Sequence, residues 1–263
     1  MTYKSAIPPV SGLAIQRPGK PVEIVYPPGA PRKVFALHTS THPIEKSSSA
    51  AVTKAALDRM VKATPGAEVK WIDASKLHIV QNLSCYANGK PDCANPAAGP
   101  YRCWAHHEST RNPEKYGGKD QMPVIYDALA WCDTAIFTTS VRWGSRSALC
   151  QKVIERMDTL ENRGASYGEP YPLRGKKLGV VVTGLHWKTG EVATGLMEAL
   201  RWFGFATTPD DACVLAWQRS NDPMFEHPDN DRPHVETWLR SPEGTAAVDK
   251  FSRSVSSASK VWV

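Results

Sequence analysis

The residue types best suited to chemistry gather in a turn that follows a short apolar run. Residues 135–137 read Ala-Ile-Phe, typical of a buried strand, and the chain then enters a helix through a Trp, a Gly and several hydroxyl side chains. Ligands of an open parallel sheet bind beyond the carboxyl ends of its strands. A Trp-Gly-Ser turn there offers a flat apolar surface beside backbone amides, which suits a planar aromatic cofactor. The candidate binding residues of this second loop (139–146) are Thr139, Ser140, Val141, Arg142, Trp143, Gly144 and Ser145.

An earlier loop, the first loop (39–49), is rich in hydroxyl side chains and also leads from an apolar run into a helix. Amide hydrogens and the dipole at a helix N-terminus bind a phosphate monoester, and short hydroxyls add donors. The chain has no Gly-x-Gly-x-x-Gly and no Gly-Lys-Ser/Thr motif, so a dinucleotide or triphosphate loop is not expected. The same hydroxyls also suit a plain helix cap without a ligand. The candidates are Thr39, Ser40, Thr41, His42, Ser47, Ser48 and Ser49.

A third loop (183–187) follows the apolar run at residues 178–182. Its candidate binding residues are Thr183, Gly184 and His186. Loops at strand ends favour ligand contact, so His186 is a candidate hydrogen-bond partner for a ring or a phosphate. A single His in a loop is also commonly a packing or surface residue, and both interpretations stay open.

Residues 132–145, with the helix behind them, resemble the second flavin loop of the flavodoxin-like NAD(P)H-dependent FMN reductases. In that family an aspartate and a strand precede Pro-x-Tyr-Trp-Gly-Ser, and the helix carries a Lys and Asp-Arg. Here Ser140 replaces the Pro, Arg142 the Tyr, and Glu155 the Asp. The family's first loop usually starts Gly-Ser-x-Arg, whereas this chain lacks the Gly and has His42 nearest to the Arg.

The resemblance covers about residues 33–205 and implies a function. It implies FMN held by the three loops, NADH or NADPH as electron donor, and a quinone, nitro, azo or flavin acceptor. Because the cofactor performs the difficult step, no side chain is assigned as a catalytic acid or base. The resemblance also implies a homodimer or homotetramer. Two alternatives remain open: a non-catalytic flavin-binding electron carrier or sensor, and a flavodoxin-like interaction domain without cofactor.

The composition limits the class of protein. With 263 residues, 41% of them hydrophobic, the chain is long enough for one elaborated domain. Its net charge of +6 differs from that of a small acidic electron carrier and favours anionic ligands. The basic residues are spread out and not interleaved with aromatics, so nucleic-acid binding is not expected. Without a membrane-length apolar run or a signal-peptide pattern, we expect a soluble cytoplasmic protein.

Apolar runs alternate with helical patterns along most of the chain. This alternation predicts an α/β fold, a doubly wound five-stranded parallel sheet with helices on both faces. The family resemblance implies the flavodoxin-like version of this fold, with strand order 2-1-3-4-5. Residues 1–32 are Pro-rich and predict an extended N-terminal arm. The domain would span 33–263, with insertions at about 74–120 and 218–233, the first of them an ordered lid near the site. The expected strands are 34–37, 69–72, 135–137, 178–182 and 214–217.

Cys85, Cys93 and Cys103, with His106 nearby, form the main competing group. Their spacings lack the tight Cys pairs of common zinc sites, so we expect reduced thiols and no metal. Cys132, Cys150 and Cys213 lie in apolar stretches of the sequence, so we expect them to be core residues. On the helix after the second loop, we expect Lys152, Glu155 and Arg156 to pair with one another at the surface.

Overall fold

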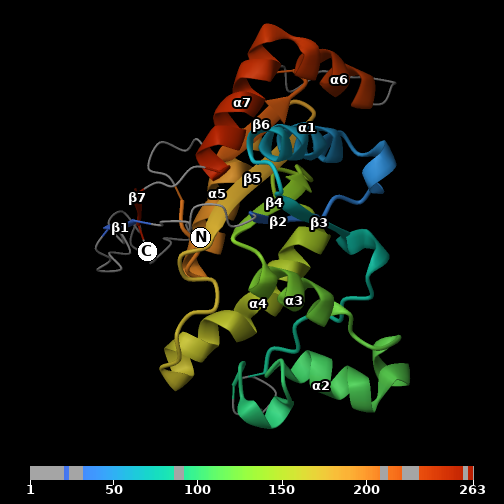
Figure 1. The fold of residues 1–263 in the computed structure, drawn as a ribbon. Helices are drawn as coiled ribbons and strands as arrows, with labels where there is room; N and C mark the ends of the chain where they lie inside the picture. Colours follow the sequence, from blue (N-terminus) through green and yellow to red (C-terminus); the bar gives the residue numbers. More distant parts are fainter. Residues whose placement is uncertain are drawn as a thin grey trace, which may run out of the picture.

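The computed structural model describes residues 21–23, 32–85, 92–207, 213–220, 231–256 and 260–262. Five parallel strands form the central sheet in the order β3-β2-β4-β5-β6 (Figure 1). Counted along the chain, this is the predicted order 2-1-3-4-5, so the flavodoxin-like fold is confirmed. The strands are β2 (Lys33–His38), β3 (Glu68–Asp73), β4 (Thr134–Ser140), β5 (Lys177–Gly184) and β6 (Val214–Gln218).

The strand register brings three loops to one edge of the sheet. His38, the last residue of β2, pairs with Thr138 in β4, and Ser140 at the end of β4 pairs with Thr183 in β5. Because all three strands run in the same direction, the loops that follow them leave the sheet together. These are the first, second and third loops of the sequence analysis.

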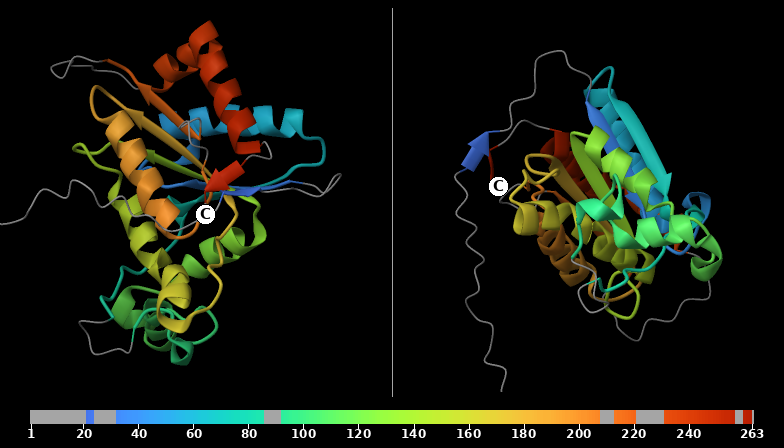
Figure 2. Two further views of the ribbon diagram at one scale, coloured as in Figure 1. Left: turned by 90° about the vertical axis from the view of Figure 1, so that its left-hand side faces the viewer. Right: turned by 90° about the horizontal axis from the view of Figure 1, so that it is seen from below.

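Helices cover both faces of the sheet, as the nearly continuous apolar character of the strands requires. On one face α1 packs against α6 and α7, and on the other α3, α4 and α5 lie against the strands (Figures 1 and 2). Gly179 in β5 allows α7 to approach closely, because a Cβ there would lie 2.8 Å from the Phe251 ring. The helices are α1 (Ser48–Ala63), α3 (Met122–Trp131), α4 (Ala148–Tyr167), α5 (Thr189–Trp202), α6 (Arg232–Arg240) and α7 (Pro242–Ser256).

The segment between β3 and α3 has its own short elements. It contains α2 (Trp104–Arg111) and three 3-10 helices, η2 (Ala74–Lys76), η3 (Pro96–Ala98) and η4 (Pro113–Tyr116). Figure 1 shows α2 beyond α3 and α4, at the end of the molecule opposite α6 and α7. The sequence did not predict α2, because one eight-residue helix gives little periodicity. Its role as a lid stays a prediction.

The parts of the chain outside this core are described only partly. From the predicted arm, β1 (Pro21–Glu23) pairs antiparallel with β7 (Lys260–Trp262), whereas residues 1–20 and 24–31 lie outside the described residues. Most of the predicted excursion at 218–233 lies outside them as well. None of the described helices combines the length and apolar character that crossing a membrane requires.

Candidate functional site

Side-chain hydrogen bonds join the first loop to the second. The Thr39 hydroxyl donates to the carbonyl of Thr138 at 2.7 Å, and the hydroxyls of Ser40 and Ser140 lie 3.1 Å apart. Further out, the Arg142 guanidinium donates to the Thr41 hydroxyl at 2.9 Å. The two loops therefore form one continuous polar surface beyond β2 and β4.

Ser147 ties the start of α4 to both of these loops. Its hydroxyl caps α4 by accepting from the Cys150 N–H at 3.1 Å and donates to the Thr39 carbonyl at 2.5 Å. Its own N–H donates to the Thr139 hydroxyl at 3.2 Å. The sequence analysis did not single out Ser147, although a Ser directly before a helix is a recognisable N-cap signal.

The third loop completes the edge. The Val141 N–H donates to the Thr183 carbonyl at 2.9 Å. Gly144 lies against the residues that follow His186, since a Cβ on it would come within 3.0 Å of Lys188 and 3.4 Å of the Trp187 ring. The three predicted loops thus converge in space.

The tip of the second loop is a tight two-residue turn. Backbone hydrogen bonds run in both directions between Arg142 and Ser145, at 2.7 and 3.0 Å. The central residues, Trp143 and Gly144, have φ of 49° and 72°, as a type I′ turn requires. A positive φ strains a bulky residue such as Trp, yet this indole is 96% exposed. Strain that supports an exposed aromatic at a loop edge marks a candidate ligand contact.

The hydroxyls of the first loop divide into two groups. Ser47 is the N-cap of α1, accepts from the Ala50 N–H at 3.3 Å and shares a hydrogen bond with Ser49 at 2.9 Å. Both side chains are buried, which favours the plain-cap interpretation for this pair. Thr41 and His42 are exposed and Ser48 is half-buried, so these three remain for a ligand.

His38 lies beneath the first loop and was not among the predicted site residues. It is fully buried, and its Nε2 is hydrogen-bonded to the His42 carbonyl at 2.9 Å. Burial lowers the pKa of His38, outweighing the charge-favouring effect of that carbonyl. Within the described part of the chain, neither His38 Nδ1 nor the neighbouring Asp73 Oδ2 has a hydrogen-bond partner. The only sequence signal was a polar residue ending a buried strand.

The predicted pairing of Lys152, Glu155 and Arg156 with one another is wrong. Arg156 is buried and forms a bidentate ion pair with Asp120, at 2.9 and 2.7 Å. Lys152 donates to the Ile79 carbonyl, and Glu155 accepts from the Gln151 amide. The reason is the tertiary structure: the segment that precedes α3 packs on α4, buries Arg156 and supplies its partner, Asp120.

The cysteines are reduced and buried. Cys132, Cys150 and Cys213 belong to the main core, as predicted. Cys85, Cys93 and Cys103 lie apart from it, around a small cavity beside α4. Among the described residues, no group of three or more His, Cys, Asp or Glu side chains has an arrangement that would hold a metal ion.

The fold is that of a flavodoxin-like α/β protein in which three loops converge at one edge of the sheet. Residues 32–218 match the family described as NADPH-dependent FMN reductase. The chain therefore belongs to the NADPH-dependent FMN reductase family, as the resemblance of its second loop predicted. No curated protein matches its sequence.

Several solved structures share the fold at low sequence identity. RosB, solved with the bound intermediate 8-demethyl-8-formylriboflavin-5'-phosphate, is 15% identical with a TM-score of 0.63, covering 86% of this chain and 77% of that one. An azoreductase from Bacillus anthracis is 14% identical with a TM-score of 0.50, covering 86% and 99%. Azoreductase AzrA is 12% identical with a TM-score of 0.53, covering 85% and 99%.

Proposed function

We propose that this protein binds FMN across its three converging loops and uses NADH or NADPH to reduce a quinone, nitro, azo or flavin acceptor. One observation carries the proposal: hydroxyls, backbone amides, a guanidinium and an exposed indole from three separate strand ends meet at one edge of the sheet. Membership of the FMN reductase family supports the same cofactor. The structure of RosB with a bound flavin phosphate supports this ligand class on a related fold.

The residues fit a phosphate monoester at the first loop. The N–H groups of the first turn of α1 face outward, as at every helix N-terminus, and the dipole favours an anion there. Thr41, His42 and Ser48 would add donors around it. The Arg142 guanidinium, already hydrogen-bonded to Thr41, would supply a positive charge. Thr39, Ser40, Ser47 and Ser49 would hold the loop in shape through the internal hydrogen bonds described above.

The second and third loops would hold the ring. Trp143 offers an aromatic face, Gly144 and Ser145 bring the backbone close, and Val141 is fixed by its bond to Thr183. Thr139 and Ser140 would position this loop, while Gly184 and His186 would lie at the ring edge. When bound, FMN would supply the redox chemistry, and the chain's own task would be to orient the ring and exclude water.

An absorbance spectrum of the purified protein tests the proposal. We expect flavin bands, their bleaching on anaerobic addition of NADPH or NADH, and turnover when a quinone is added. Arg142→Gln should weaken FMN binding, whereas Arg253→Gln, the same change at an exposed position of α7, should leave it unchanged. Colour without bleaching would favour the carrier or sensor. Protein that takes up no added FMN would favour the interaction domain and contradict the proposal.

The assembly is a separate proposal. A homodimer or homotetramer follows from the family resemblance, and light scattering would test it by giving a mass that is a multiple of the 28.9 kDa chain. A mass equal to one chain at working concentration would contradict it. The cytoplasmic location and the lack of nucleic-acid binding stay predictions from composition.

A further inference from the structure

We propose that Cys85 and Cys93 are a redox-active thiol pair that small hydroperoxides convert into a reversible disulfide. The two residues lie in the segment between β3 and α3, away from the three loops. With Ala98 and Trp104 they form an apolar cluster separate from the main core. The inference therefore does not depend on the proposed flavin site.

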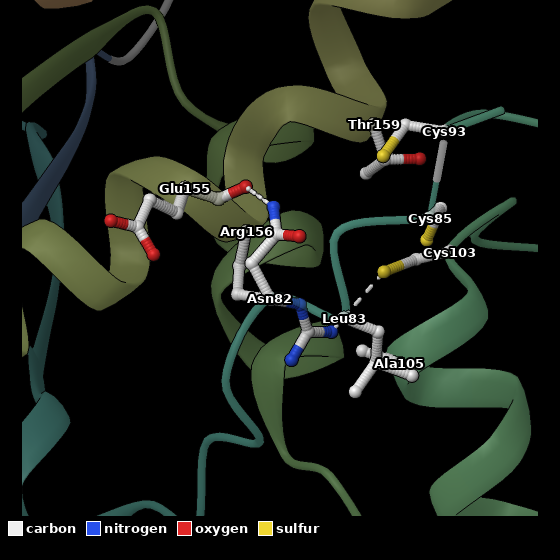
Figure 3. A pocket seen from close by; sticks show the side chains of 9 residues that line it. All are labelled: Asn82, Leu83, Cys85, Cys93, Cys103, Ala105, Glu155, Arg156 and Thr159. Carbon is white, nitrogen blue, oxygen red and sulfur yellow. Dashed lines mark hydrogen bonds between the residues drawn. The ribbon is translucent and has the colours of Figure 1, made fainter. Parts of the chain in front are cut away.

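The two thiols line one small cavity. Its volume is about 10 Å³, room for roughly one water-sized molecule. In the view of Figure 3, the Cys85 sulfur lies between those of Cys93 and Cys103. The cavity wall also includes half-buried Asn82 and exposed Glu155, so on that side it adjoins solvent. The cavity therefore offers a small polar oxidant a path to the thiols from that side.

The surroundings make the two thiols chemically unequal. The neighbouring Cys93 thiol lowers the pKa of Cys85; burial and the Asp158 carboxylate oppose this effect, and the Arg156 charge supports it. The pKa of Cys93 is raised by the neighbouring Cys85, by burial and by the Asp158 carboxylate. Cys85 is therefore the better nucleophile and Cys93 the thiol that resolves the product. Such a pairing is characteristic of redox-sensing cysteines.

The chemistry balances with one hydroperoxide. The Cys85 thiolate attacks one oxygen of hydrogen peroxide and breaks the O–O bond, which gives a sulfenic acid and, after protonation, water. Cys93 then attacks the Cys85 sulfur, the S–S bond forms, and the hydroxyl leaves as water with the Cys93 proton. In total, two thiols and one peroxide give one disulfide and two waters.

Cys103 is the third thiol in the cavity and the alternative partner for a disulfide. Cys103 accepts a hydrogen bond from the Arg156 guanidinium at 3.3 Å, as the dashed line in Figure 3 marks. That guanidinium is held by Asp120, so Cys103 is anchored to the α4 side of the cavity. We assign the disulfide to Cys85 and Cys93 because these two residues pack in one apolar cluster, whereas Cys103 belongs to a different cluster with Val80 and Ala105.

Peptide mapping of the native full-length protein distinguishes a Cys85–Cys93 disulfide from one that includes Cys103. Trypsin releases residues 77–102 as one peptide, because Lys90 is followed by Pro91, and cuts again between Arg102 and Cys103. The native protein is treated with hydrogen peroxide, the peroxide is removed, and the cysteines are then labelled with N-ethylmaleimide in urea. We expect peptide 77–102 to be unmodified and lighter by two hydrogens, and dithiothreitol to restore labelling. A cross-link between peptides 77–102 and 103–111 would overturn the assignment. A disulfide that forms only when peroxide is added to the protein in urea would also overturn the proposal.

Two variants and one control sharpen the result. Cys85→Ala should abolish peroxide-dependent protection of Cys93, and Cys93→Ala should leave Cys85 as a sulfenic acid that dimedone traps. Cys132→Ala, in the main core, should leave the cross-link unchanged. If a variant misfolds, the wild-type peptide map still decides. The wild type should also lose N-ethylmaleimide reactivity at Cys85 faster than at Cys103 during peroxide treatment, and the opposite order would contradict the proposal.

Discussion

At the scale of single residues, Trp143 shows how the site departs from what stability alone would select. The first central position of a type I′ turn favours Asn, Asp or Gly, and a bulky side chain there is strained. Yet Trp143 stands at this position, and among the described residues it is the most exposed of the large hydrophobic side chains. Strain of this kind costs about 1–3 kcal/mol and is kept where the surroundings or the function require it.

We expect Trp143→Asn to stabilise the fold and weaken the flavin site. Asn tolerates a positive φ, so the free energy of unfolding should rise by about 1 kcal/mol. Loss of the aromatic contact, worth about 0.5–1.5 kcal/mol, should raise the Kd for FMN about two- to tenfold. Urea unfolding and FMN titration measure the two effects. Trp202→Asn on α5 is the control. It should raise neither the free energy of unfolding nor the Kd for FMN.

Gly184, at the end of β5, is required for its small size. Its φ is not positive, but a Cβ would lie 2.5 Å from Thr189 and 3.1 Å from Val141, both of which border the three-loop edge. We expect Gly184→Ala to destabilise the protein by about 1–3 kcal/mol and to weaken FMN binding. Gly190→Ala, in the first turn of α5 with open space around it, should be neutral or stabilising by up to about 1 kcal/mol. Equal effects of the two changes would contradict this steric argument.

At the scale of elements, a buried ion pair holds the segment before α3 to α4. Asp120 accepts two hydrogen bonds from Arg156 and one from the Val80 N–H, and His106 lies 3.6 Å away. Arg156 also donates to the Val80 carbonyl at 2.5 Å. The side chains of Asp120 and Arg156 are almost fully excluded from solvent, so each depends on the other.

We expect Asp120→Asn to destabilise the protein by about 3–5 kcal/mol, because it leaves a buried guanidinium without its charge partner. Burial acts to raise the pKa of Asp120, but His106 and Arg156 outweigh it and hold that pKa well below the ordinary range. The carboxylate's contribution is therefore complete above about pH 4, the unfolded pKa, and is lost as the pH falls further. Urea unfolding of wild type and variant should differ most at neutral pH and converge in acid.

The control for this prediction is Asp58→Asn. Asp58 forms an exposed pair with Lys54 one turn away on α1, at 2.6 Å. Exposed pairs of this spacing contribute about 0.3–0.5 kcal/mol, so this change should have a small effect at every pH. A comparable loss in both variants would show that the buried pair has no special role.

At the scale of the whole molecule, the buried Lys177 links the sheet to the last described helix. It stands at the start of β5 and donates to the Ser254 carbonyl of α7 at 2.9 Å. Burial, helped by the nearby charge of Arg32, lowers the pKa of Lys177 to about 8. In the unfolded chain the pKa is near 10.4, so between these values the unfolded state binds more protons and stability rises with pH.

We expect Lys177→Met to remove the increase in stability with pH that Lys177 causes. The full effect of Lys177 is of the order of 3 kcal/mol between pH 8 and 10.4. Burial raises the pKa values of Cys132 and Tyr126, and their ionisation destabilises the fold over the alkaline range. The measurement is therefore the difference between wild type and variant in urea unfolding at pH 7.5 and 9.5. A difference that does not change with pH would contradict the assignment.

The sequence predicted the sheet more completely than the site. Five apolar runs, each bounded by turn residues, were enough to predict the strands, because burial on both faces demands such runs. The strand order followed from the family resemblance. The three loops were predicted from the residue types that follow those runs. His38 and Ser147 were missed, since their roles depend on His42 and Thr39, which reach them only through folding. Whether the predicted site residues bind FMN stays to be tested.

The sequence by itself determined the fold class, the family resemblance and the loops that carry the candidate chemistry. Local spacing encodes these features, because strand and helix periods and turn residues act over a few neighbours. Only the tertiary structure decided that Arg156 faces Asp120 rather than Glu155, and that Cys85 and Cys93 share a cavity. Those contacts join α4 to a segment with little periodicity of its own. A buried polar or charged side chain needs a partner, and the folded structure determines which residue lies close enough. Sequence spacing does not predict that residue.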